Sequence, residues 1–172
     1  IEEFSIDSYR VYVSGISNGA FMAYTTACFL SNKVAAVAPV SGSLSPEDYE
    51  SCNPQRPLSI IHIHGINDSS IPIQGNDYIT PLQLVSAFWS SFNSCTENII
   101  VDGEDLNNDG YSWYSEISTN CQNGVSVNFT YLENFDHSWP TSNPEKGYSA
   151  DIDGATFIWE FLSLYDTNGL ID

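Results

Sequence analysis

The chain has 172 residues, a length typical of one domain with a hydrophobic core. It carries 22 acidic but only 4 basic residues, and the resulting formal charge of −18 argues against binding to nucleic acid or to an anionic membrane surface. Hydrophobic residues make up 42% and aromatic residues 13%, too large an apolar share for a disordered segment. Because no run of about 18 apolar residues occurs, we expect no membrane span.

In the first half of the chain, short apolar runs alternate with amphipathic segments, a pattern typical of an α/β fold. The expected strands and helices are, in chain order, strand 10–14, helix 18–30, strand 34–40, strand 58–63 and helix 81–92. Residues 41–56 are rich in Ser, Gly, Pro and Asp and are expected to form a loop. Thr80 is the expected N-cap of the second helix, with Pro81 in its first turn.

The second half changes character after Glu97. The expected elements are strands 98–101, 111–117 and 125–132, with a turn at 107–110 between the first two, and a closing helix 151–164. Helical spacing predicts that this last helix buries Phe157, Ile158, Phe161 and Leu162. No internal repeat divides the chain, so we expect residues 1–172 to belong to one domain.

The sharpest motif is Gly15-Ile16-Ser17-Asn18-Gly19, a GxSxG sequence between an expected strand and an expected helix. A sharp strand-to-helix turn would present Ser17 as a nucleophile and would require small residues at Gly15 and Gly19. The backbone N–H of Asn18, at the positive end of the helix, would then face a developing oxyanion. The alternative interpretation is a glycine-rich turn with a solvent-exposed serine.

A nucleophilic serine needs a histidine base and a carboxylate that orients it. Asp68 follows the strand 58–63 and His137 follows the strand 125–132, so both belong to the edge where α/β sheets gather their ligands. The order Ser, Asp, His along the chain is that of α/β-hydrolases. We therefore predict Ser17 as nucleophile, His137 as general base and acid, and Asp68 as its orienting carboxylate. Asp136 and Glu133 are competing carboxylates beside His137.

Two other patterns could hold a metal. His62 and His64 share one face of a strand and could form a metal site together with His137, but we expect strand histidines paired by local hydrogen bonds instead. The predicted chemistry of Ser17 needs no cofactor. The residues Asp105, Asn107, Asp109 and Glu116 formally match a calcium loop. Because strands rather than helices are expected to flank this segment, we interpret it as a β-turn. If these residues did bind calcium, the rival hypothesis, of another functional class, would be a non-catalytic binding fragment stabilised by calcium.

The chain has four cysteines, Cys28, Cys52, Cys95 and Cys121, and no CxxC pair. An even number at wide spacing fits two disulfides in an oxidising compartment, extracellular or periplasmic, whereas four free thiols would fit the cytosol. Three pairings are possible, and pairing of sequence neighbours gives Cys28–Cys52 and Cys95–Cys121.

Several segments in order resemble the polyhydroxybutyrate depolymerase and feruloyl esterase family. They are 10–20 (RVYVSGISNGA), 35–42 (AAVAPVSG), 52–57 (CNPQRP), His62 to Gly65 with Asp68, Phe88-Trp89 leading to Cys95, and 137–140 (HSWP). The resemblance implies a secreted carboxylic-ester hydrolase of α/β-hydrolase fold, with the triad on Ser17, Asp68 and His137. It also implies similar cysteine pairs and a pocket lined by Trp139.

The resemblance has two departures. Phe135-Asp136 stand where the family usually has a pair of glycines. The chain also begins just ahead of the nucleophile strand, so we expect an incomplete domain that lacks the family's earlier strands. The nucleophile strand would then have an exposed edge, through which copies could associate. The alternative substrates for the same triad are peptides and acetylated carbohydrates, in place of polyesters or aromatic plant-wall esters.

Overall fold

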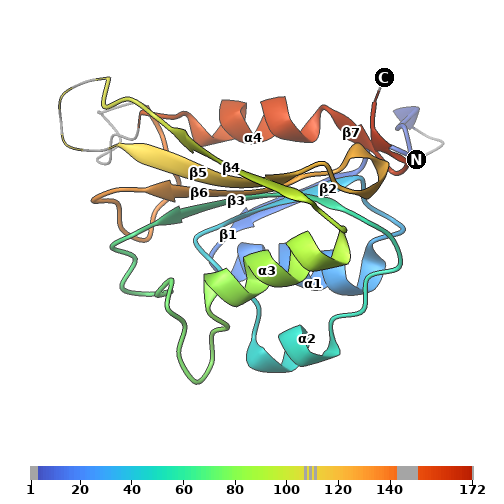
Figure 1. Ribbon diagram of the computed structural model, residues 1–172, viewed down its shortest axis with the longest axis horizontal. Helices are drawn as coiled ribbons and strands as arrows, with labels where there is room; N and C mark the ends of the chain where they lie inside the picture. Colours follow the sequence, from blue (N-terminus) through green and yellow to red (C-terminus); the bar gives the residue numbers. More distant parts are fainter. Residues whose placement is uncertain (1–3, 107, 109, 111, 143–150, 172) are drawn as a thin grey trace.

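The computed structural model describes residues 4–106, 108, 110, 112–142 and 151–171. Its centre is a six-stranded sheet with the order β1–β2–β3–β6–β5–β4 (Figure 1). The strands are β1 (Tyr12–Ile16), β2 (Ala36–Val40), β3 (Ser59–Gly65), β4 (Glu97–Asp102), β5 (Trp113–Thr119) and β6 (Val127–Leu132). The first three strands and β6 run parallel, and β5 and β4 continue the sheet antiparallel. A small hairpin follows, formed by β7 (Tyr165–Asp166) and β8 (Gly169–Leu170).

Helices cover both faces of this sheet. The helices α1 (Asn18–Leu30), α2 (Pro46–Ser51) and α3 (Leu82–Phe92) lie on one side, and α4 (Gly154–Leu162) lies on the other (Figure 1). The predicted class, a mostly parallel sheet with helices on both faces, is therefore confirmed. Every position of β2, β3 and β6 is buried, as expected for central strands that are covered on both faces. No helix in the described part of the chain is long and apolar enough to cross a membrane.

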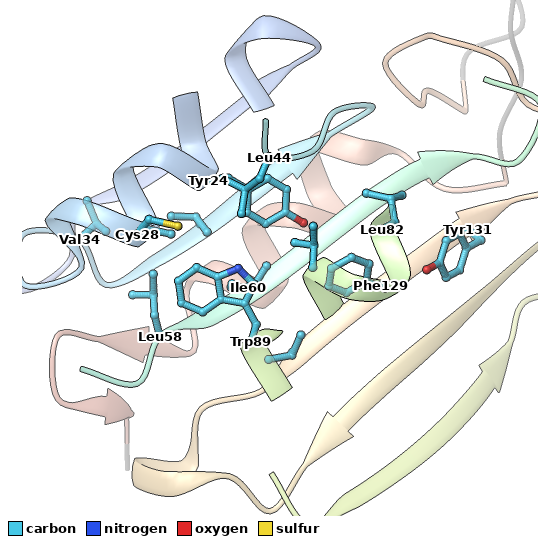
Figure 2. Packing of buried hydrophobic residues seen from close by; sticks show 14 residues of the cluster. Tyr24, Cys28, Val34, Leu44, Leu58, Ile60, Leu82, Trp89, Phe129 and Tyr131 are labelled. Carbon is cyan, nitrogen blue, oxygen red and sulfur yellow. The ribbon is translucent and has the colours of Figure 1, made fainter. Parts of the chain in front are cut away.

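Two hydrophobic clusters fill the spaces between sheet and helices. The larger lies under α1 and α3, where Tyr24, Trp89 and Phe129 are its large buried aromatic residues (Figure 2). The smaller lies under α4 and includes Ile158 and Leu162, two of the residues predicted to face the core. The other two, Phe157 and Phe161, pack against this cluster while partly buried.

The chain departs from the sequence prediction between the second and third strands. Residues 41–56 are not only loop, because they contain α2, capped by Ser45 through a 3.0 Å hydrogen bond from the Asp48 N–H. The expected N-cap Thr80 was also wrong. Pro81 occupies the cap position of α3, while the Thr80 hydroxyl is buried without a hydrogen-bond partner among the described residues.

Other boundaries shift by one to three residues. The third strand extends beyond Ile63 to Gly65 and so includes both strand histidines. The turn predicted at 107–110 falls partly outside the described residues, and the hairpin of β7 and β8 was not predicted. In the described sheet β1 lies at one edge, and self-association through this edge stays a prediction.

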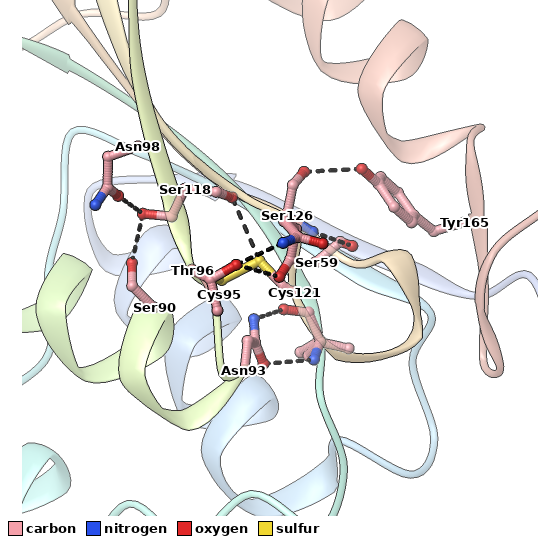
Figure 3. The surroundings of a disulfide bond; sticks show 12 residues. Ser59, Ser90, Asn93, Cys95, Thr96, Asn98, Ser118, Cys121, Ser126 and Tyr165 are labelled. Carbon is pink, nitrogen blue, oxygen red and sulfur yellow. Dashed lines mark hydrogen bonds between the residues drawn. A yellow bond between two sulfur atoms is a disulfide. The ribbon is translucent and has the colours of Figure 1, made fainter.

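Both disulfides join sequence neighbours. Cys28 pairs with Cys52, which ties α1 to the end of α2. Cys95 pairs with Cys121, which ties the residues after α3 to the loop after β5 (Figure 3). The pairing expected from sequence order is the one in the structure.

A buried asparagine beside the second disulfide anchors the start of β3 (Figure 3). The Asn93 amide donates to the Leu58 carbonyl at 2.8 Å and accepts from the Leu58 N–H at 3.1 Å. The Asn93 carbonyl also accepts from the Gln122 N–H at 2.9 Å. One side chain at the end of α3 thus satisfies both backbone groups of a buried residue that leads into the central strand.

Replacement of Asn93 by Ala leaves the Leu58 N–H and C=O buried and unpaired, so we expect a loss of about 3 kcal/mol in the free energy of unfolding. The control is Thr96→Ala, which removes an exposed hydrogen bond to Asn120 and is expected to cost about 0.5 kcal/mol or less. Urea unfolding of both variants checks this. Equal losses in the two variants would contradict the anchoring role.

Candidate active site

Ser17 lies in the sharp turn between β1 and α1. Its backbone has φ 57° and ψ −117°, a strained conformation for a residue with a side chain. The Ser17 N–H donates to the Val40 carbonyl of β2 at 2.9 Å, and its carbonyl accepts from the Ala20 N–H at 2.9 Å. The strand–turn–helix context that the motif predicted is therefore present, and the half-buried serine lies at the carboxyl end of the parallel strands.

Glycines let the backbone segments around this turn approach closely. A Cβ at Gly15 would lie 2.8 Å from backbone atoms of Gly19, and a Cβ at Gly42 would lie 2.4 Å from the Ala20 Cβ. A Cβ at Gly19 would meet nothing within 4 Å. The requirement for a small residue therefore holds at Gly15 but not, on steric grounds, at Gly19. Gly42, outside the GxSxG motif, was not singled out by the sequence.

Asp68 lies in the loop directly after β3, and its side chain is at the centre of a set of hydrogen-bond donors. The backbone N–H groups of Ser70 and Ile71 donate to its Oδ1 at 2.9 and 2.8 Å. Its Oδ2 lies 2.8 Å from His137 Nδ1 and 3.3 Å from His64 Nε2. The residue is only 4% exposed, so these contacts replace water around the carboxylate.

His137 comes from the loop after β6, as predicted. That loop packs directly over the end of β3, since a Cβ at Gly65 would lie 2.3 Å from the Phe135 carbonyl oxygen. The Asn67 N–H donates to the same carbonyl at 3.0 Å and joins the two loops. Sixty-nine residues apart in sequence, Asp68 and His137 thereby come into hydrogen-bond contact.

The competing carboxylates have other partners. Asp136 Oδ1 accepts from the backbone N–H of His137 at 2.8 Å and of Ser69 at 3.2 Å, so it holds the loop rather than the imidazole. Glu133 accepts from the Ser112 hydroxyl. Of the carboxylates considered, Asp68 is the one whose side chain contacts the His137 ring.

Among the described residues no hydrogen bond joins the Ser17 hydroxyl to the His137 ring. Among the described residues the Ser17 hydroxyl has no hydrogen-bond partner, whereas His137 Nδ1 is held by Asp68. Nucleophile–base hydrogen bonds are often long before substrate binds. Asn18, the expected oxyanion donor, is the first residue of α1 and is exposed, so its N–H belongs to the free first turn of a helix.

Burial and hydrogen bonding shift the pKa of Asp68 in opposite directions. Burial by itself raises the pKa of this carboxyl, but the hydrogen bonds from His64, the Ile71 N–H and His137 favour the charged form. The net result lowers the pKa of Asp68 to about 2. Asp68 is therefore a carboxylate over the whole neutral range, which is the state that its predicted orienting role requires.

The structure describes both strand histidines and part of the calcium-like loop. His62 Nε2 and His64 Nδ1 lie 3.0 Å apart in a direct hydrogen bond, as predicted, and no group of three potential metal ligands occurs in the described ranges. Asn107 and Asp109 of the calcium-like loop lie outside those ranges. Its last member, Glu116, pairs with Ile100 across β5 and β4.

Trp139, the residue expected to line a pocket, is half-buried and packs against the cluster under α4. Trp139 does not line the cavity of about 850 Å³ that lies between α3 and the sheet, with Tyr114, Glu116 and Tyr131 in its wall. A role for Trp139 in substrate binding thus remains a prediction.

The chain was compared with protein families, curated proteins and solved structures. The sequence model of the phospholipase/carboxylesterase family matches residues 2–102, more than half of the chain. The chain is 31% identical over 168 residues to the bifunctional acetylxylan esterase/xylanase XynS20E of Neocallimastix patriciarum, covering 98% of this chain and 22% of that protein. It is 28% identical over 144 residues to feruloyl esterase B of Piromyces equi, covering 77% of this chain and 26% of that protein.

Among solved structures, an acetyl xylan esterase from Aspergillus awamori has a TM-score of 0.56 at 15% identity, covering 95% of this chain and 62% of that one. The α/β-hydrolase-like fold predicted from the sequence is thereby confirmed. The chain spans about a quarter of the length of the curated relatives that it matches.

The close approach of Gly15 to the Gly19 backbone predicts different effects of an alanine at these two positions. Gly15→Ala forces a Cβ against the Gly19 backbone, and we expect it to lower the free energy of unfolding by about 2 kcal/mol. Gly19→Ala enters open space within a helix and is expected to leave stability unchanged or raise it by up to about 1 kcal/mol. Urea titration of both variants measures the difference, and similar effects at the two positions would show that the turn is not tightly packed.

The lowered pKa of Asp68 predicts a pH dependence of stability. A carboxyl whose pKa falls on folding stabilises the protein above its unfolded pKa, near 4, and this contribution disappears as the pH falls through the folded value of about 2. The unfolding free energies of the wild type and Asp68→Asn should therefore differ by a constant amount above about pH 5 and converge by about 1–2 kcal/mol between pH 4 and 2. Denaturant titrations from pH 2 to 7 measure this, and a pH-independent difference would contradict it.

Proposed function

The chain belongs to the phospholipase/carboxylesterase family, and on this basis we propose that it is a serine hydrolase of carboxylic esters with Ser17, His137 and Asp68 as its catalytic triad. The observation that carries the proposal is the 2.8 Å contact between His137 Nδ1 and the ionised, buried Asp68. A carboxylate in this position orients the imidazole and stabilises its protonated form. The strained turn that carries Ser17 supports the nucleophile's place in the same site.

In the proposed first half-reaction, Ser17 Oγ attacks the ester carbonyl carbon while His137 accepts the hydroxyl proton. Since Asp68 holds Nδ1, the proton goes to Nε2. The carbonyl oxygen of the tetrahedral intermediate accepts a hydrogen bond from the Asn18 N–H at the positive end of α1. The intermediate then expels the alcohol, which takes the proton from Nε2, and an acyl-enzyme on Ser17 remains.

In the second half-reaction, water replaces the alcohol. His137 Nε2 accepts a proton from the water as the water oxygen attacks the acyl carbon. The carbonyl oxygen of the resulting tetrahedral intermediate again accepts a hydrogen bond from the Asn18 N–H. Its collapse releases the carboxylic acid and returns the proton to Ser17 Oγ. No cofactor takes part in these steps.

The relatives narrow the substrate class. One is named for acetylxylan and the other for feruloyl esters, so we propose that the ester is one carried by plant-wall polysaccharide, either acetyl or aromatic. A polyhydroxybutyrate-type polyester is the alternative ester, and a peptide is the alternative outside this class. Two disulfides support an extracellular or periplasmic setting for the reaction.

The first test is covalent labelling of the chain by a fluorophosphonate, followed by intact-mass measurement. We expect one adduct per chain, located on Ser17 by peptide mapping and absent in Ser17→Ala. In His137→Ala the labelling rate should fall by about 10²-fold or more, because the general base is lost.

A matched control is Ser14→Ala, which removes a different hydroxyl from the same strand, one that donates to the Ala38 carbonyl. This variant should label at the wild-type rate. Absence of an adduct on a folded chain, or an adduct that survives Ser17→Ala, would contradict the proposal and favour the non-catalytic hypothesis. Once labelling is established, feruloyl methyl ester, acetylated xylo-oligosaccharide, a hydroxybutyrate oligomer and a peptide separate the substrate classes.

A further inference from the structure

Three buried polar side chains lie behind Asp68 and have no part in the reaction proposed above. His62 and His64 are two positions apart on β3, and Tyr24 comes from α1. All three are 0% exposed. Tyr24 belongs to the cluster of Figure 2, and the His62 ring stacks with Tyr24 and with Phe129 of that cluster. Buried polar groups of this kind are costly unless each is hydrogen-bonded, so their contacts determine where their protons lie.

The hydrogen bonds of these three side chains form a series in which each donor and each acceptor can be assigned. His64 Nε2 lies 2.8 Å from the Ile71 carbonyl, which can only accept, so in the neutral ring the proton is on Nε2. His64 Nδ1 is then an acceptor, and His62 Nε2, 3.0 Å away, donates to it. This leaves His62 Nδ1 to accept from the Tyr24 hydroxyl at 2.9 Å.

The buried surroundings keep His62 and Tyr24, at the inner end of this hydrogen-bond series, uncharged. Burial lowers the pKa of His62, and the neighbouring His64 lowers it further, so the His62 ring stays neutral. Burial also raises the pKa of Tyr24, with a smaller contribution from Tyr131, so the hydroxyl keeps the proton that it donates. The Phe129 ring stacks on His62 with 4.9 Å between centroids, and the His62 side chain is fully buried.

The outer end of the chain reaches the candidate active site. His64 Nε2 lies 3.3 Å from Asp68 Oδ2, the oxygen that contacts His137 Nδ1 at 2.8 Å. We propose that Tyr24, His62 and His64 form a buried hydrogen-bonded relay that fixes the Asp68 carboxylate and so positions His137. This inference rests on the proposed function, in which Asp68 orients the general base.

The geometry explains why such support is needed. The backbone N–H groups of Ser70 and Ile71 hold Oδ1 only, and a carboxylate held at one oxygen can still rotate about its bond to Cβ. Oδ2 contacts His137 Nδ1 at 2.8 Å, and the single His64 Nε2–H, shared between the Ile71 carbonyl at 2.8 Å and Oδ2 at 3.3 Å, fixes the plane of the group from its buried side. Ile71 contributes at both points, because its N–H binds Asp68 while its carbonyl accepts from His64, so that loop, carboxylate and relay support one another.

Two substitutions at one position separate the relay from mere packing. In His64→Gln the amide nitrogen can occupy the place of Nε2 and still donate toward Asp68 and Ile71. In His64→Asn the amide oxygen can occupy the place of Nδ1 and accept from His62, but no donor reaches Asp68. We therefore expect the rate of Ser17 phosphonylation to fall by about 10-fold or more in His64→Asn and by less than about 3-fold in His64→Gln.

A second variant and a control guard against simple unfolding. Tyr24→Phe keeps the ring and removes only the first donor of the chain, and we expect a loss of about 3-fold in the same rate. Thr130→Val removes a buried hydroxyl that bonds Ser115 on the neighbouring strand, outside the relay. This control should lower the melting temperature without changing the labelling rate.

Proton NMR of the same variants provides a readout that does not depend on activity. The His137 Nδ1 proton shared with Asp68 should give a far-downfield resonance in the wild type and in His64→Gln, but not in His64→Asn. Wild-type rates and an unchanged resonance in His64→Asn, or equal losses in the Asn and Gln variants, would overturn the relay. If the wild-type chain does not label at all, the proposed function fails, and the resonance alone still decides whether His64 positions the Asp68–His137 pair.

Discussion

The candidate site depends on how one buried carboxylate is solvated. Folding removes Asp68 from water, which disfavours its charged form. Hydrogen bonds from N–H groups on two loops and on β3 compensate for the lost hydration. The same contacts join the end of β3 to the loop after β6, where His137 lies. Without these donors the carboxylate would be costly to bury, and without the carboxylate the two loops would lose their common partner. The hydrogen bonds that stabilise the Asp68 charge are therefore the same ones that fix the two loops at this edge of the sheet.

The second constraint is the turn that carries Ser17. Its strained backbone costs on the order of 1–3 kcal/mol and persists because β1 is hydrogen-bonded to β2 and α1 packs against both strands. Gly15 and Gly42 permit this packing because neither has a side chain to fill the contact. The Ser17 hydroxyl is thus held at the edge of the sheet by residues to which the proposed reaction assigns no chemical step.

Much of this arrangement was predictable because local patterns and topology agree. Continuous apolar runs identified β2 and β3, the GxSxG motif between strand and helix identified the serine turn, and the sheet's carboxyl edge led to Asp68 and His137. The helix α2 was missed because a six-residue polar helix has too little apolar periodicity, although Ser45-Pro46 was a readable start signal.

Tertiary contacts decided what the sequence could not. The cap of α3 is Pro81 rather than Thr80, because both backbone groups of Thr80 bond the loop after β2: its N–H donates to the Leu44 carbonyl and its carbonyl accepts from the Ser43 hydroxyl. The HxH spacing on β3 correctly predicted two histidines joined by a hydrogen bond. The contribution of Tyr24, thirty-eight residues earlier on another element, could be recognised only once α1 was packed on the sheet.

The most direct test of the account is a crystal structure of the chain after reaction with a fluorophosphonate. We predict phosphorus bonded to Ser17 Oγ, one phosphonyl oxygen within hydrogen-bond distance of the Asn18 N–H, and His137 between the adduct and Asp68 with its Nδ1 contact intact. An adduct on another residue, or a His137 ring that has left Asp68 and points away from Ser17, would contradict the assignment of these residues to one catalytic site.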